Sequence, residues 1–520
     1  MTRSAGILLP LFSIRTARGW GIGEYPDLGA IAPWLAEGRV SVLMLLPLNE
    51  AALGQDSPYS AASAFALDPV YVRLEEVPEF VELGGEAALP PEDRALLEAL
   101  RGRATVDYPG VRGLKNRWLR RAFDHFHGSG AAAGGERAED LARFREEQRP
   151  WLDGYLLWRA LKDEHPDGSW RSWPEGPRVK SPAALEEAGR RLSGAMCFFE
   201  YLQWQAFRQL ARARRAAAAA GVRLAGDLPF LVAEDSADVW ARQAEFRFDA
   251  TVGVPPDAFS AEGQDWGLPV YRWDVIAAGG YAWQRERGLA SARLYDLVRI
   301  DHVVGFYRTY ARPLDRARPH HFVPPDEPSQ RAQGEAVMAA FREGGVGLIA
   351  EDLGTVPPFV RESLTAQGIP GYRVLRWEKD GAVFRDPAAW PALSVATTGT
   401  HDSEPIAVWW DALDDHERRA MHDLPPLRGL DAGQSARFGP PVHDALLEAV
   451  YGSGSDLLLL PVQDAFGLRE RINLPGTVSD ENWSYRLPWT IGNLSREPVV
   501  RAATAKLAEL AVRHRRARSE

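Results

Sequence analysis

The stretch Leu297-Val298-Arg299-Ile300-Asp301 is a short apolar run that ends in an acidic residue. Similar short runs recur along the chain and are separated by stretches with helical periodicity. After residue 347 they recur roughly every 25 residues, which is about the length of one βα unit. Such alternation predicts parallel strands joined by crossover helices. The predicted strands cover residues 42–48, 66–72, 222–225, 297–300, 347–350, 372–377, 394–397 and 457–462.

Three predicted helices are each followed by a glycine, the residue that most readily ends a helix in the left-handed conformation. They cover residues 28–37, 198–220 and 357–367. Eight strands alternating with helices favour a (β/α)8 TIM barrel, which belongs to the α/β class. A doubly wound sheet is disfavoured because no glycine-rich dinucleotide fingerprint follows the first predicted strand. We expect no separate C-terminal β-sandwich.

The chain has 520 residues, whereas a (β/α)8 barrel needs only about 250. We therefore expect one elaborated catalytic barrel over residues 1–520, with large and mainly helical insertions between its strands. The segment from about 75 to 195 is charged, rich in tryptophan and helical in pattern, so we interpret it as a helical insertion subdomain. The segment from about 235 to 290 is interpreted as an active-site loop or insertion.

Composition excludes several classes of partner and site. The chain has 61 Lys and Arg against 71 Asp and Glu, a net charge of −10, and it has no long basic block. This argues against nucleic acid or an anionic membrane as the main partner. Cys197 is the single cysteine, which excludes intrachain disulfides and multi-cysteine metal sites. No apolar run reaches the roughly 18 residues of a membrane span.

The apolar run at residues 6–14 has the look of a short secretion signal. Pro10 interrupts it and no small-residue cleavage pattern follows, so we interpret it as a buried strand. A cytoplasmic protein is therefore expected. For the oligomeric state, a monomer is favoured.

Four acidic residues follow predicted strands: Asp227, Asp301, Glu351 and Asp402. In a barrel, the C-terminal ends of the strands converge on one mouth, which carries the chemistry. One acid after a strand is usually a helix cap, but four on four strands predict a shared acidic site. Crowded carboxylates raise one another's pKa, which suits acid and base catalysis.

Several carboxylates, aromatic loops and no reactive cysteine pattern point to cleavage of glycosidic bonds. In that chemistry one carboxylate attacks the anomeric carbon, and a second, protonated one gives its proton to the leaving oxygen. Arg299 lies two residues before Asp301 and so faces the same side of its strand. A fixed cation there would keep Asp301 ionised.

Three segments carry a resemblance to a known family: Arg299-Ile300-Asp301-His302, Ala350-Glu351-Asp352-Leu353-Gly354 and Gly399-Thr400-His401-Asp402. They resemble conserved blocks of the 4-alpha-glucanotransferases, the amylomaltase or disproportionating-enzyme family, which is related to the α-amylases. The likeness extends along nearly the whole chain. Further similar segments are residues 56–59, 63–65, 226–229, 235–240, 255–257, 259–260, 263–264, 266–267, 473–477 and 482–483.

The resemblance implies roles for individual residues. Asp301 would be the nucleophile, Glu351 the general acid and base, and Asp402 the residue that holds the hydroxyls of the sugar being cleaved. It also implies a set of substrate-binding residues, in which Tyr59 and Trp266 would stack on glucose rings and Asp227 would support the arginine. That set is Arg299, His401, Tyr59, Ser57, Trp266, Asp227 and Asp257.

The resemblance further implies transfer of α-1,4-glucan segments to the 4-hydroxyl of glucose or maltooligosaccharide acceptors, by a retaining double displacement. Its partners would be maltooligosaccharides and glucans derived from starch or glycogen, and neither a cofactor nor a metal is expected. An α-1,4-glucan hydrolase of the α-amylase type, with the same carboxylate site, is the alternative. Two further alternatives are a metal enzyme built on the same acids with His302 and His401, and an inactive glucan-binding protein.

Four positions or segments depart from the family pattern. Gly54 stands where the family usually has a sugar-contacting tyrosine, and Val303-Val304 replaces a segment with a cation beside the nucleophile. Ser403-Glu404-Pro405 replaces the usual residues after Asp402, and Ala258 replaces a bulkier loop residue. We expect these changes to shift donor length preference and the ratio of transfer to hydrolysis.

Overall fold

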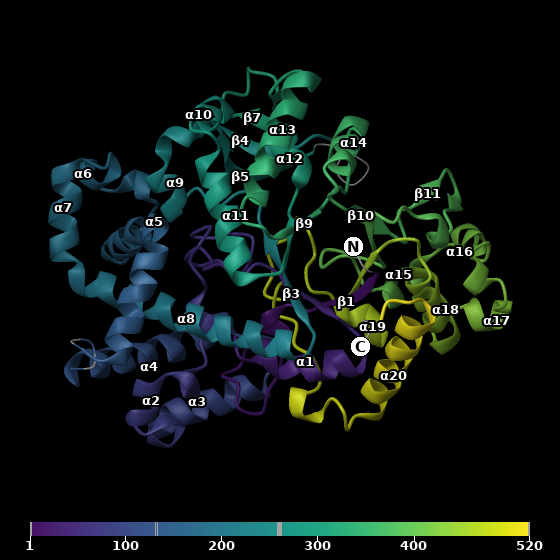
Figure 1. Ribbon diagram of the computed structural model, residues 1–520, viewed down its shortest axis with the longest axis horizontal. Helices are drawn as coiled ribbons and strands as arrows, with labels where there is room; N and C mark the ends of the chain where they lie inside the picture. The colour runs from purple at the N-terminus through teal and green to yellow at the C-terminus, as the bar shows by residue number, and fades with distance from the viewer. Residues whose placement is uncertain (1–2, 131, 133, 257–262, 518–520) are drawn as a thin grey trace.

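The computed structural model describes residues 3–130, 132, 134–256 and 263–517, and its centre is a closed barrel of parallel strands (Figure 1). The predicted (β/α)8 barrel is thus confirmed. In spatial order, the barrel strands are β1 (Ser4–Leu8), β14 (Leu457–Pro461), β13 (Ser394–Thr397), β10 (Gly371–Val374), β9 (Gly347–Ala350), β6 (Leu297–Ile300), β3 (Arg223–Leu228) and β2 (Val42–Met44).

One predicted barrel strand is wrong. Residues 66–72 form no strand, because Pro69 has no N–H to donate to a neighbouring strand, and a short 3-10 helix runs over Pro69–Tyr71 instead. The Asp68 carboxylate caps that helix by accepting a hydrogen bond from the N–H of Val70. The remaining barrel strand is β1, from the apolar N-terminal run, and it pairs with both β14 and β2.

The strand register places the acidic residues side by side at one end of the barrel. Asp227 pairs in register with Arg299, and Ile300 pairs with Ala350. Asp301 and Glu351 therefore follow neighbouring strands at equivalent positions. The backbone N–H of Glu351 donates to the carbonyl of Ile300, at 3.0 Å, which fixes this alignment.

Helices surround the barrel, and the three predicted from their terminal glycines are all present. The long helix α8 ends before Gly221, which is left-handed with φ +80°, and α14 ends before Gly368, with φ +66°. Gly38 after α1 is not left-handed. The helices that follow or precede barrel strands are α1 (Asp27–Glu37), α8 (Ser193–Ala219), α11 (Ala282–Leu294), α13 (Glu327–Arg342), α14 (Pro358–Ala366), α18 (Pro440–Tyr451), α19 (Val462–Phe466) and α20 (Pro498–Arg513).

The chain between β2 and β3 is helical and lies to one side of the barrel, at the left of Figure 1. Near the end of this segment, α8 returns to the barrel and packs closely on α1, where Gly29 faces Ala216. The other helices of the segment are α2 (Pro78–Glu82), α3 (Pro91–Gly102), α4 (Tyr108–Gly128), α5 (Glu136–Glu164), α6 (Glu175–Arg178) and α7 (Pro182–Arg191).

A second, antiparallel sheet lies beside the mouth and has the order β5-β4-β7-β8. Its first two strands come from the segment between β3 and β6, and the other two come after β6. The bounds given above for the two insertions stay predictions. The strands are β4 (Phe246–Val254), β5 (Gln264–Tyr271), β7 (Thr309–Pro313) and β8 (His321–Val323), and short helices α9 (Ala237–Ala241), α10 (Trp273–Ala278) and α12 (Val303–Tyr307) flank them.

The segment after β10 contributes a small hairpin and short helices at the right of Figure 1. Among the described residues, no helix is long and apolar enough to cross a membrane. The remaining elements are β11 (Lys379–Asp380), β12 (Val383–Phe384), α15 (Ile406–Ala412), α16 (Asp415–Met421) and α17 (Ala432–Ser435).

Candidate active site

All four predicted carboxylates lie at the C-terminal end of the barrel. Asp227 is the second-last residue of β3, Asp301 follows β6 directly, and Glu351 follows β9 directly. Asp402 lies in the loop after β13. The strands that precede these four residues end at the same mouth of the barrel, as predicted from acidic residues that follow barrel strands.

Arg299 joins three of these carboxylates through one guanidinium group. Its Nη1 donates to both oxygens of Asp227, at 2.7 and 2.6 Å, and to Oδ1 of Asp301, at 3.0 Å. Its Nη2 lies 3.2 Å from Oε2 of Glu351. The Asp301 and Glu351 side chains are 22% and 21% exposed, so both are held by the protein yet open to a ligand.

Glu351 has the surroundings of a carboxyl that stays protonated near neutral pH. Burial raises its pKa to about 8, and the negative charge of Asp301 adds to that rise, while Arg299 opposes it. The backbone N–H of His302 donates to Oε2 of Glu351, at 2.6 Å, and fixes the carboxyl in place. A carboxyl that stays protonated, beside a second carboxyl and one cation, is an arrangement that can supply an acid and a nucleophile.

His302 takes a backbone conformation that is rare for a residue with a side chain. Its φ is +43°, in the left-handed region, and this turn directs the N–H at Glu351. Burial lowers the pKa of the imidazole to about 4, so the ring is neutral. The ring lies edge-on to Trp266, with 4.7 Å between the ring centroids.

Tyr59 links the early loop to the barrel mouth. Its hydroxyl donates to Oδ2 of Asp227, at 2.7 Å, and one face of its ring stacks on His401, with centroids 5.2 Å apart. Ser57, two residues earlier, accepts a hydrogen bond from the N–H of Tyr59 and holds the turn. Tyr59 and Ser57 are thus placed at the mouth, beside Asp227.

Asp402 is the most exposed of the four acids, with 43% of its side chain accessible. Asn473 donates to its Oδ1, at 2.6 Å, and the ring Nε2 of His401 lies 3.4 Å from its Oδ2. Arg471 donates to the backbone carbonyl of Asp402, at 2.7 Å. The carboxylate is therefore oriented from two sides and remains accessible to a sugar hydroxyl.

Trp266, the predicted ring platform, lies on β5 and is half-buried. Its indole N–H donates to Gln264, at 3.1 Å, which fixes the indole ring next to His302. The predicted substrate-binding residue Asp257 lies outside the described residues, as does Ala258. The described part of the active-site segment thus brings Trp266 to the mouth.

Four residues with contacts in the site were given no part in sugar binding or catalysis of glycosyl transfer by the sequence analysis: His302, Asn473, Arg471 and Trp483. Trp483 lies against the rings of both Tyr59 and His401, with centroids 5.7 and 5.9 Å away. The signal for Asn473 and Trp483 was the C-terminal segment 473–483, whose motifs were recognised without a contact being assigned. Arg471 lies just before that segment and gave no signal. The contact made by His302 could not be predicted from its residue type, because its backbone N–H makes the contact.

The structure shows what surrounds three of the residues that depart from the family pattern. Glu404 accepts from Arg376, at 2.9 Å, and lies 3.5 Å from Arg471, so it belongs to the cluster that holds the Asp402 loop. Gly54 is left-handed, with φ +76°, and a side chain there would meet open space. Val304 is buried. Within the part of the chain that the structure describes, no group of three or more His, Cys, Asp or Glu residues could hold a metal ion.

Comparisons with known proteins show the family to which the chain belongs. A family profile described as 4-alpha-glucanotransferase matches residues 9–491. The chain is 32% identical to a 4-alpha-glucanotransferase of Chlamydia pneumoniae, over 93% of this chain and 91% of the relative. It is 34% identical to one from Thermus thermophilus, over 94% of this chain and 95% of the relative.

Among solved structures, the fold is similar to that of an amylomaltase from Streptococcus agalactiae. That structure matches with a TM-score of 0.84 and 24% identity, over 99% of this chain and 100% of the other. A Corynebacterium glutamicum amylomaltase matches with a TM-score of 0.81 and 23% identity, over 97% of this chain and 75% of the other. On the length of these matches and the barrel they share, the chain belongs to the 4-alpha-glucanotransferase family.

Proposed function

We propose that this 4-alpha-glucanotransferase works by a retaining double displacement in which Asp301 is the nucleophile. The Asp301 carboxylate attacks the anomeric carbon of a bound α-1,4-glucan, and a β-linked glycosyl-enzyme forms as the bond to the leaving oxygen breaks. The contact with Arg299 at 3.0 Å supports this role, because a cation there favours the ionised carboxylate.

Glu351 acts as the general acid in the first step and the general base in the second. In the first step its proton goes to the leaving 4-oxygen, and in the second it accepts the proton of the acceptor's 4-hydroxyl. The observation that carries the proposal is the shared Arg299 group, which contacts Asp301 and Glu351 with its two ends while burial raises the pKa of Glu351 to about 8.

The other residues hold the glucan in this scheme. Asp402 and His401 bind hydroxyls of the sugar that is cleaved, and Asp227 orients Arg299 without touching the reacting carbon. The remaining substrate contacts are assigned to Tyr59, Ser57, Trp266 and Asp257, with Tyr59 and Trp266 stacking on glucose rings.

Transfer requires that a glucan hydroxyl, and not water, reaches the glycosyl-enzyme. Trp266 and its β5 segment border the mouth, so an acceptor glucose stacked there would displace water from the Asp301 side. The substrates proposed are maltooligosaccharides and starch-derived or glycogen-derived glucans, and the scheme uses no cofactor. We further propose, from the sequence, that the enzyme is cytoplasmic and monomeric. Cell fractionation tests the location, and light scattering tests the oligomeric state.

The product profile from maltotriose tests the transferase scheme. The proposed enzyme converts maltotriose to glucose plus a ladder of longer chains, and labelled glucose enters the ladder at the reducing end. Glucose and maltose alone would indicate hydrolysis and contradict the proposal. Glu98→Gln, at an exposed position on α3, is a matched control that should give the wild-type ladder.

A further inference from the structure

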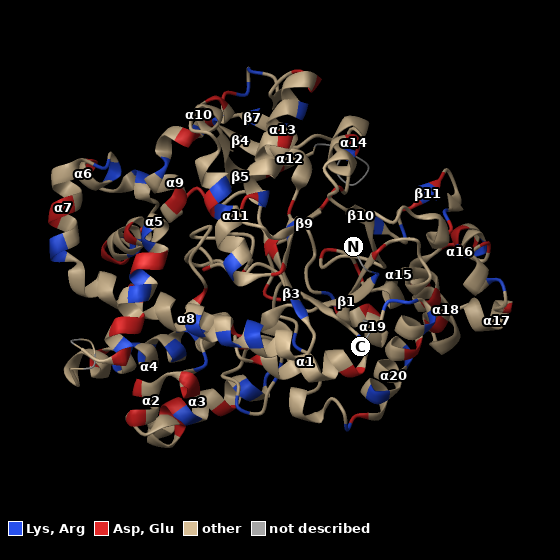
Figure 2. Ribbon diagram, viewed as in Figure 1, with Lys and Arg blue, Asp and Glu red and all other residues tan. Residues whose placement is uncertain are grey.

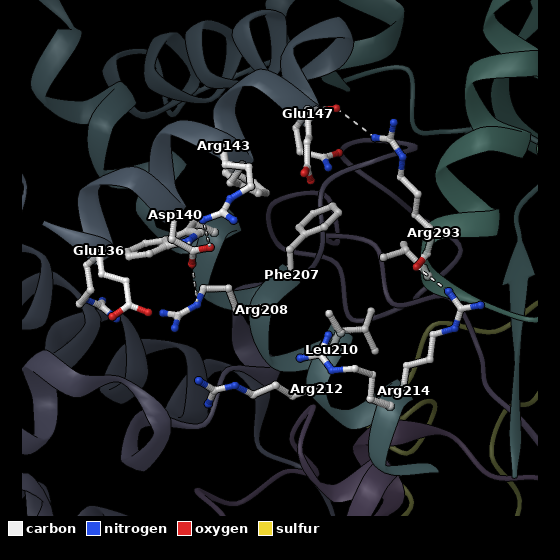
Figure 3. A pocket seen from close by; sticks show the side chains of 17 residues that line it. Glu136, Asp140, Arg143, Glu147, Phe207, Arg208, Leu210, Arg212, Arg214 and Arg293 are labelled. Carbon is white, nitrogen blue, oxygen red and sulfur yellow. Dashed lines mark hydrogen bonds and ion pairs between the residues drawn. The ribbon is translucent and has the colours of Figure 1, made fainter. Parts of the chain in front are cut away.

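A cavity of about 920 Å³ lies between α5, α8 and the end of α11 (Figure 3). We call it the α5–α8 cavity, after the two helices that supply most of its walls. None of the active-site residues described above lines it. Its volume falls in the range of small-molecule binding sites, which is roughly 300–1,000 Å³.

The walls of this cavity are strongly basic in a chain that is acidic overall. Seven of its 17 lining residues are arginines and three are Asp or Glu, whereas the whole chain has a net charge of −10. Figure 2 shows several basic segments along α8. Such a local excess of one sign of charge attracts a ligand of the opposite sign.

Three of the arginines are bonded to carboxylates of the protein, and a fourth lies near one. Arg208 donates to Asp140, at 3.0 Å, and Arg214 to Asp296, at 2.8 Å, as Figure 3 shows in part. Arg214 also donates to two backbone carbonyls at the end of α11. The third pair is Arg137 with Glu79, and Arg143 lies 3.6 Å from Asp140, beyond hydrogen-bond range.

Three arginines keep most of their donors open. Arg212 lies 3.7 Å from its nearest carboxylate, on Glu76, which is beyond hydrogen-bond range. Arg293 donates one N–H to the carbonyl of Glu147. Among the described residues, the guanidinium of Arg215 has no hydrogen-bond or ion-pair partner, and Arg215 lies three residues after Arg212 on the same side of α8. A guanidinium fork matches the oxygens of a phosphate group.

Arg208 lies among like charges. Burial lowers the pKa of its guanidinium, and the neighbouring Arg137 and Arg212 lower it further, while Asp140 opposes the effect. An anion bound in the cavity would relieve the repulsion among these charges.

The cavity also offers a flat apolar face. Phe207 is half-buried and lies between the arginines of the two walls in Figure 3. Its ring is nearly parallel to that of Trp151, with 5.9 Å between centroids and 25° between planes, which fixes its orientation. An aromatic face beside arginines suits a ligand with a sugar or base attached to its phosphate.

We propose that the α5–α8 cavity binds phosphate esters, with Arg212, Arg215 and Arg293 holding the phosphate and Phe207 contacting the organic part. The volume fits one ester group, and the cavity is open to solvent on the side of Arg212 and Arg215. This site is separate from the glucan site and does not depend on the mechanism proposed for it. The ester can be a free sugar phosphate or nucleotide, or a phosphate carried by a glucan chain.

Calorimetric titration of the full chain at about 50 mM salt tests the proposal. The probes are glucose 6-phosphate, ADP, and maltodextrin with and without phosphate groups. The triple variant Arg212→Ser/Arg215→Ser/Arg293→Ser removes the open donors. Arg190→Ser, an exposed arginine on α7, is the matched control. Unchanged product formation from maltotriose shows that the triple variant is folded, because none of the three residues lies in the glucan site.

We expect at least one phosphate-bearing probe to bind the wild type and the Arg190→Ser control, and to bind the triple variant at least tenfold more weakly. A tenfold loss confined to phosphorylated maltodextrin identifies a glucan-borne phosphate, and a loss with glucose 6-phosphate or ADP identifies a free ester. Equal affinity of wild type and triple variant for every phosphate probe would overturn the proposal. An equal loss of affinity for phosphate-free maltodextrin would overturn it as well.

Discussion

The barrel mouth and the α5–α8 cavity each gather charges of one sign, but in different surroundings. At the mouth, Asp227 and Arg299 are both 4% exposed, and burial moves the pKa of Glu351 to about 8. In the cavity, Arg212 and Arg215 are exposed to solvent. Burial thus makes a charge cluster able to exchange protons, whereas exposure leaves it able only to bind.

The largest effect should come from the two reacting carboxyls. We expect Asp301→Asn and Glu351→Gln each to lower the rate of maltotriose conversion on the order of 10³-fold or more, because each removes a separate covalent or proton-transfer step. Initial rates of glucose release measure this. Near wild-type rates in either variant would show that the substituted carboxyl takes no part in the chemistry.

The pH profile sharpens the comparison, because it depends on a buried group. Glu351 must be protonated to act as acid, so kcat/KM should fall above about pH 8. Arg299 opposes the rise in the pKa of Glu351, so Arg299→Met should move this basic limb to higher pH. It should also lower the maximal rate about 100-fold, because Asp301 loses its cation. A limb that stays in place or moves to lower pH would contradict this assignment.

A smaller effect is expected at the edge of the mouth. Trp266→Ala removes the indole that lies against His302, and water should then reach the glycosyl-enzyme more often. We expect the ratio of transfer to hydrolysis to fall severalfold, while total maltotriose consumption changes less. Chromatography of the products measures both quantities. An unchanged ladder of longer chains would argue against the platform role.

Stability should reveal the cost of the buried carboxyl. The folded-state pKa of Glu351 is raised from its ordinary 4.5 to about 8, so the unfolded chain loses this proton first as the pH rises. The wild type therefore loses stability between about pH 4.5 and pH 8, and Glu351→Gln should escape that loss. We expect a gain of about 4 kcal/mol at pH 8 and none at pH 4. Denaturant unfolding at both pH values measures this gain in stability. An equal gain at both values would show that the gain does not come from the raised pKa of Glu351.

The smallest effect is expected in the cavity. Without phosphate, replacing Arg212, Arg215 and Arg293 by serine should change unfolding stability by no more than about 0.5 kcal/mol, because exposed charges contribute little. Thermal unfolding of the variant beside Arg190→Ser measures this. A large loss of stability would place these arginines with the structural ion pairs of the molecule.

The sequence was most informative where a local pattern decides the structure. Short apolar runs ending in acids located Asp227, Asp301 and Glu351 at the barrel mouth, because strand ends in a closed barrel must converge. The pattern failed at residues 66–72, where an apolar run contains Pro69 and forms no strand. There, the loss of a backbone donor outweighs apolar content.

Contacts between loops far apart in the sequence could not be predicted. Asn473 holds Asp402 across 71 positions of the chain, and only the folded barrel brings the two together. His302 acts through its backbone, so residue type carries no signal. The α5–α8 cavity likewise combines Arg212 with Arg293, from separate helices, and composition alone does not join them.

Arg299 contacts Asp301 and Glu351 with opposite ends of one planar group. In the proposed mechanism, the negative charge is on Asp301 and the proton is on Glu351 before the glycosyl-enzyme forms. In the glycosyl-enzyme, Asp301 is an uncharged ester and Glu351 is the anion. The electrostatic field of the mouth thus suits reactant and intermediate alike, because the cation already faces both positions. Little rearrangement of the protein is then needed when the charge crosses from one strand end to the next.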